Sequence, residues 1–179
     1  MSTVIACSAQ AAANYVISKF KLYKSKLSKT KLQCILVCAH LDAVADNKSV
    51  LSESLNLMHF GFVIKSLASD LIRFSYDEDL SNKISKNHLS GDIRVESRDV
   101  LTVIRYLDAA ISKMEKLPDK ECIRMLNGPK SLWHYIAFEL YKGNHLIDDY
   151  TKISDKMLYV SISRLLDSNF KQDSSEQSS

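Results

Sequence analysis

One segment, residues 28 to 45, constrains the fold more than any other part of this chain. It reads SKTKLQCILVCAHLDAVA, and Ser28 is a residue type that caps helix N-termini. Wound as a helix, the segment is apolar on nearly every side. Such a helix must be covered all round, so we expect it to lie in the middle of a domain. The apolar positions are Leu32, Cys34, Ile35, Leu36, Val37, Cys38, Ala39, Leu41, Ala43 and Val44.

Two cysteines and a histidine in this segment raise the question of a metal or nucleophile site. Cys34 and Cys38 are one helical turn apart on one face, whereas His40 lies about 200° further round from Cys38. The three side chains therefore cannot converge on one ion. Apolar surroundings would also raise a thiol pKa and weaken a nucleophile. We predict that Cys34 and Cys38 pack in the core, as neither zinc ligands nor disulfide partners, and that the chain has no metal site.

The composition favours helices, because only four glycines and two prolines occur among 179 residues. We expect a mainly α fold, a single compact helical domain of about six helices over residues 8 to 166, with a small β element at residues 55 to 59. Residues 171 to 179 have the composition of a disordered tail. Besides 28 to 45, the expected helices cover residues 8–24, 62–74, 98–117, 119–126 and 131–142, and a last one that starts after Ser154.

The sequence predicts three further details of these elements. The apolar stripe of residues 62 to 74 has helical spacing and includes Ile72. The last helix is expected to bury Leu158, Ile162, Leu165 and Leu166. The polar segment from residue 75 to 97 is expected to contain at most a short strand at residues 92 to 95.

The formal net charge of +3 hides an asymmetry, because six lysines and no acidic residue precede Asp42. The cluster from Lys19 to Lys31 can contact a phosphate backbone or an acidic protein. It also fits a structural role, in which the first lysines end one helix and Lys29 and Lys31 solvate the start of the next. We favour the structural role and keep nucleic-acid binding as the alternative.

Catalytic and cofactor motifs are absent from the sequence. It has no P-loop, dinucleotide-binding glycine pattern, zincin motif, nucleophile elbow or C-x-x-C pair. We expect no catalytic residue and no cofactor, and the remaining enzymatic hypothesis is a hydrolase or transferase site assembled from His40, His59 or Cys122. Scattered cysteines, no secretory signal pattern and no long apolar run indicate a cytoplasmic protein without a membrane span.

Several short motifs, in order, resemble the Panacea domain of bacterial and phage antitoxins. They are AAANYVISKF, then LSKTKLQCILVCAHLDAVADNKSVLSESL, then HFGFVIKSL, then GPKSLWHYIAF, and together they span roughly residues 8 to 166. The residues that match the family pattern are Asn14, Tyr15, Lys31, Leu32, Gln33, Gly61, Val63 and Trp133. The pattern differs at Cys34, Val37, Phe62 and Asn127, where the family usually has a lysine, an aromatic residue, a proline and a histidine.

The resemblance implies a non-enzymatic protein that binds and neutralises a toxin encoded beside it. It places the partner-binding face at Gly61, Phe62, Val63, Lys65 and Trp133, because the family's non-core signature residues gather there. Phe62 either fills the core or projects as an anchor, and we favour the core because it begins an apolar stripe. The alternatives are a DNA-binding regulator that uses the lysine cluster, and a partner-binding bacterial or phage protein that has left the antitoxin role.

Overall fold

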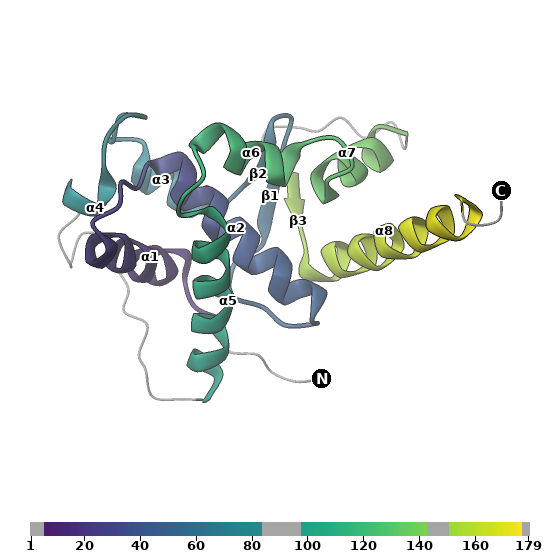
Figure 1. The fold of residues 1–179 in the computed structure, drawn as a ribbon, viewed down its shortest axis with the longest axis horizontal. Coiled ribbons are helices and arrows are strands. Elements are labelled where there is room, and N and C mark those ends of the chain that lie inside the picture. Colours follow the sequence, from purple (N-terminus) through teal and green to yellow (C-terminus); the bar gives the residue numbers. More distant parts are fainter. Residues whose placement is uncertain (1–5, 84–97, 143–150, 177–179) are drawn as a thin grey trace.

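The computed structural model describes residues 6–83, 98–142 and 151–176, and these form a mainly helical domain with a small antiparallel sheet (Figure 1). The prediction of the fold class is confirmed. The elements are α1 (Ala9–Tyr23), α2 (Lys29–Ala45), β1 (Leu55–Met58), β2 (Gly61–Val63), α3 (Lys65–Leu71), α4 (Leu80–Lys83), α5 (Arg98–Met114), α6 (Asp119–Asn127), α7 (Leu132–Lys142), β3 (Thr151–Ile153) and α8 (Asp155–Glu176).

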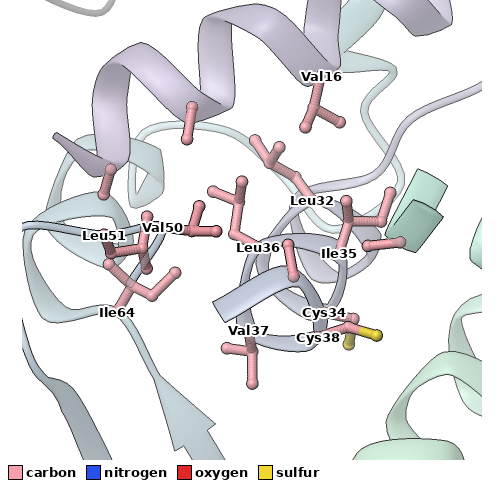
Figure 2. Close-up of a cluster of buried hydrophobic side chains, with 14 of the residues drawn as sticks. Val16, Leu32, Cys34, Ile35, Leu36, Val37, Cys38, Val50, Leu51 and Ile64 are labelled. Atoms are coloured by element: carbon pink, nitrogen blue, oxygen red, sulfur yellow. The ribbon is translucent and has the colours of Figure 1, made fainter. Parts of the chain in front are cut away.

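Helix α2 lies at the centre of the domain, as the sequence predicts. It packs against α1, α3, α5, α6, α8 and β2, and most of its side chains are buried. Figure 2 shows side chains from successive turns of α2 pointing outward into the surrounding apolar cluster. Leu32, Ile35 and Leu36 are completely buried, and Cys34 and Cys38 are buried and not disulfide-bonded.

Serine caps begin the two N-terminal helices. The Ser8 hydroxyl accepts a hydrogen bond from the backbone N–H of Ala11 at 3.2 Å, and the Ser28 hydroxyl accepts one from Lys31 at 3.0 Å. Each cap satisfies an N–H that has no partner within its own helix. The predicted starts of both helices therefore agree with the structure.

The three strands form a sheet in the order β2-β1-β3, with both pairs antiparallel. A two-residue turn at His59 and Phe60 joins β1 to β2, and β3 returns from far along the chain to pair with β1. The predicted strand at residues 55 to 59 is thus one part of a larger sheet. The prediction that a helix begins at Phe62 is wrong, because Phe62 and Val63 belong to β2 and α3 starts at Lys65.

Two side chains and the end of α8 differ from the sequence predictions. Ile72 is 81% exposed and not part of a buried stripe, and Leu166 is exposed on α8, contrary to expectation. Helix α8 continues to Glu176, so residues 171–176 of the expected tail are helical, and no glycine or proline interrupts that stretch. The expected strand at residues 92 to 95 lies outside the described residues.

Candidate functional site

A groove of about 450 Å³ lies beside the hairpin of β1 and β2, and we call it the β2 groove. Its lining comes from the N-terminal half of α2, from α3 and the chain after it, from α6 and from the hairpin. Its lining residues are Lys29, Thr30, Gln33, Cys34, Met58, Phe60, Phe62, Val63, Ala68, Leu71, Ile72, Tyr76, Ile123 and Asn127.

Large apolar side chains stand exposed around this groove. The exposed fractions are 54% for Phe60, 81% for Ile72, 73% for Tyr76 and 42% for Ile123. They come from the hairpin, from the end of α3 and beyond, and from α6, so the fold brings together residues that are far apart in sequence. Contiguous exposed apolar surface on a folded domain is typical of a binding site. Sequence patterns did not indicate this cluster, because each member is a single apolar residue in a different segment.

Gln33 fixes the groove's base to the end of β2. Its side-chain Oε1 accepts from the backbone N–H of Ile64 at 3.2 Å, and its Nε2 donates to the carbonyl of Ile64 at 3.3 Å. The amide of one side chain therefore occupies both backbone groups of Ile64, as a neighbouring strand would. The Panacea pattern contains this glutamine, but no sequence motif indicated that it would bind the backbone of Ile64.

Gly61 and Asn127 meet at the other end of β2. The Asn127 Nδ2 donates to the carbonyl of Phe60 at 2.9 Å, and a Cβ on Gly61 would lie only 2.2 Å from that nitrogen. Gly61 also has a φ of +148°, which residues with side chains rarely adopt. The backbone angle therefore favours glycine here, and a larger residue would also displace the Asn127 amide from the Phe60 carbonyl.

The sequence-predicted partner residues all lie at or near the hairpin. Phe62 is buried and Val63 half-buried, and both line the β2 groove, while Lys65 is exposed at the start of α3. Trp133 is half-buried against the core, and its Nε1 donates to the carbonyl of Met58 at 2.9 Å. Because Met58 pairs with Gly61, the structure brings Trp133 to the same turn. Phe62 fills the core, as predicted, and borders the groove at the same time.

Lys29 is the single charged residue among those lining the β2 groove. Its Nζ donates to the carbonyl of Phe74 at 2.7 Å and lies 3.9 Å from the centre of the Tyr76 ring. These contacts hold a positive charge at one end of an otherwise uncharged surface. Lys29 does more than solvate the start of α2.

The other lysines of the N-terminal cluster are not among the described residues that line the β2 groove. Lys19 pairs with Asp108 of α5 at 3.2 Å. Lys31 is buried, and its Nζ donates to the carbonyl of Glu115 at 3.2 Å, so the expectation that it solvates the helix surface is wrong. The aliphatic part of a lysine packs readily against a core while its amine reaches a carbonyl at the edge. The remaining members, Lys21, Lys24 and Lys26, are exposed.

The buried thiols are poor nucleophiles. Burial raises the pKa of Cys34 to about 12 and that of Cys38 to about 11. Burial also raises the pKa of Cys122. All three thiols remain protonated at neutral pH, which removes the reactive thiolate form.

The residues of the enzymatic hypothesis have separate surroundings. His40 is completely buried, its Nδ1 accepts from the backbone N–H of Leu51 at 3.2 Å, and its Nε2 lies 3.0 Å from Asp155 Oδ1. His59 is exposed, with its ring edge-on to Phe60. Cys122 is buried in α6, with its sulfur 3.9 Å from the carbonyl of Met114. Nothing in these contacts joins the three into one site.

No cluster of three or more histidine, cysteine or acidic side chains suited to a metal ion occurs among the residues that the structure describes. Within the same residues, every helix is too short or too polar to cross a membrane. No protein-family model, curated protein or solved structure matches the chain.

Proposed function

We propose that the protein binds a protein partner through the β2 groove and carries out no catalysis. The observation that carries this proposal is the group of exposed apolar side chains, Phe60, Ile72, Tyr76 and Ile123, around one groove. Aromatic and aliphatic side chains that lose water on contact supply most of the free energy of protein association. Only one of the described residues that line the groove is charged, so the groove suits such a partner better than it suits a phosphate backbone.

The resemblance to Panacea antitoxins suggests the kind of partner. We propose a cytoplasmic antitoxin that neutralises a toxin encoded by the adjacent gene. The family-like residues Gln33, Gly61 and Val63 shape or line the β2 groove, which supports the groove as the place of contact. The protonated thiols and the separate histidines give no support to a catalytic alternative.

Coexpression with the product of the adjacent gene tests this function. We expect the adjacent product to arrest growth alone, to be harmless with this chain, and to co-purify with it. An adjacent product that is harmless alone and does not co-purify would overturn the antitoxin function.

A change of charge at Lys65 provides a second test of the interface. Lys65 is exposed beside the end of β2, so Lys65→Glu is expected to slow complex formation while leaving the melting temperature unchanged. Stopped-flow association rates with the purified partner measure this effect. Equal rates for both proteins would place the interface away from Lys65.

A further inference from the structure

Strand β2 has one edge paired to β1 and another edge that faces away from it. A two-residue turn joins the strands, so the hydrogen-bonded pairs are Met58 with Gly61 and Asn56 with Val63. Phe62 stands between them, opposite Leu57 in a pair without hydrogen bonds. Its N–H and C=O therefore point away from β1, and they have no hydrogen-bond partner among the described residues.

The outward backbone groups on either side of Phe62 are already occupied. Asn127 donates to the carbonyl of Phe60, and Gln33 takes both backbone groups of Ile64. Both of these side chains line the β2 groove, as does Phe62 itself. The groove therefore borders β2 at Phe62, whose unpaired backbone groups lie between two positions that polar side chains occupy.

The walls of the groove fit a particular kind of chain. An extended segment that pairs with a strand edge places alternate side chains on opposite sides. Here these side chains would meet apolar residues such as Val63, Ile72 and Ile123. Lys29 is the one charged residue among the described residues that line the groove. We therefore expect the bound segment to carry an acidic side chain that forms an ion pair with Lys29.

We propose that the β2 groove binds an extended, mainly apolar segment of a protein partner, which pairs with β2 at Phe62 alone, between the Asn127 and Gln33 side chains, and places a carboxylate at Lys29. This inference rests on the proposed function, whose partner it describes more closely. Backbone hydrogen bonds to Phe62 fix the register of the segment, and the apolar walls supply affinity.

The probe is a peptide selected from a phage library of random dodecapeptides on the immobilised full-length chain. Binding of the synthetic peptide is measured by fluorescence anisotropy. Selected sequences are expected to alternate apolar residues and to carry an acidic one. Ile72→Lys, in the groove wall, is expected to weaken binding at least about tenfold. Leu22→Lys is the matched control, because Leu22 is 74% exposed on α1 and does not line the groove.

Methylation of single peptide nitrogens tests the strand geometry without altering the protein. An added strand directs the N–H groups of alternate residues toward β2. Methylation at the residue facing Phe62 is expected to weaken binding about tenfold, and methylation of its neighbours to change it little. If methylation at every position weakened binding equally, the inference would be overturned. Equal losses of peptide affinity in Ile72→Lys and Leu22→Lys would also overturn it.

Two further outcomes separate this inference from the proposed function. Peptide binding with these properties, in a protein that fails to neutralise the adjacent product, would overturn the antitoxin function and leave the groove inference standing. Neutralisation that survives Ile72→Lys, together with no enriched peptide, would overturn the inference alone. A stable homodimer that Ile72→Lys dissociates would also overturn it, because a second copy would then occupy the edge.

Discussion

At the scale of single residues, His40 joins three distant parts of the chain. Its Nδ1 accepts from Leu51, so the proton of the neutral ring is on Nε2, which donates to Asp155 at 3.0 Å. The ring thereby ties α2 to the loop before β1 and to the first residue of α8. Because it is completely buried, each of its hydrogen bonds is costly to leave unmade.

His40→Ala is expected to lower the free energy of unfolding by about 1 to 3 kcal/mol from the unpaired Leu51 N–H, with a further loss from the cavity. Urea denaturation measures the change. Asp155→Asn is the milder control, since its side-chain oxygen still accepts from Nε2. A His40→Ala protein as stable as the parent would contradict the role of the ring.

Asp155 makes stability depend on pH. Burial pushes the pKa of Asp155 upward, but hydrogen bonds from the His40 ring and from the Ser49 hydroxyl outweigh burial and hold the pKa below its ordinary value. A carboxylate with a depressed folded-state pKa contributes stability above its unfolded pKa of about 3.9, and this contribution is lost as pH falls through the folded pKa. The stability difference between the parent and Asp155→Asn is expected to shrink between pH 7 and pH 3. Urea denaturation at both pH values tests this, and a constant difference would contradict it.

Leu36 tests the centre of the fold. Leu36→Asp is expected to unfold the domain, because an unpaired buried carboxylate costs several kcal/mol out of the roughly 5 to 15 that stabilise a domain. Leu101→Asp on α5 is the control, since Leu101 is 63% exposed. Circular dichroism melting distinguishes the variants, and an unchanged melting temperature for Leu36→Asp would contradict the buried position of α2.

At the scale of elements, the Gln33 side chain couples α2 to β2. Gln33→Leu keeps the approximate size of the side chain and removes both hydrogen bonds to Ile64. We expect a loss of about 1 to 3 kcal/mol in the free energy of unfolding and faster hydrogen exchange at the Ile64 amide. Gln10→Leu, which removes one contact with Asp70, is the control. An unchanged hydrogen-exchange rate at the Ile64 amide would show that the Gln33 side chain does not hold β2.

The longer helices and β1 were predictable from sequence, whereas α4, β2 and β3 were not. The apolar face of α1 and the all-round apolar character of α2 extend over many residues, and a serine caps each helix, so local sequence determines both. Strands β2 and β3 have three residues each, and β3 pairs with residues almost a hundred positions earlier. The residues after Gly61 also fit a helical stripe. Burial of Lys31 depends on Glu115, far along the chain, and no local pattern contains that information.

At the scale of the whole molecule, the described elements form a helical body around α2, from which α8 extends to one side (Figure 1). The β2 groove lies at the hairpin, where α2, α3 and α6 approach the sheet. The resemblance located Phe62 and Val63 at this place, but it did not indicate Ile72, Tyr76 or Ile123. Those residues share a surface only after α3 and α6 have packed on α2, so the site is a product of tertiary structure.

The proposed function places the partner in the β2 groove. The most direct test is the dissociation constant between the full-length chain and the product of the adjacent gene, measured by calorimetry for the parent, Ile72→Lys and Leu22→Lys. Because Ile72 and Leu22 are both largely exposed, neither change should disturb folding. The account predicts that Ile72→Lys weakens the complex at least about tenfold and that Leu22→Lys leaves it unchanged. Equal affinity for all three proteins would contradict it.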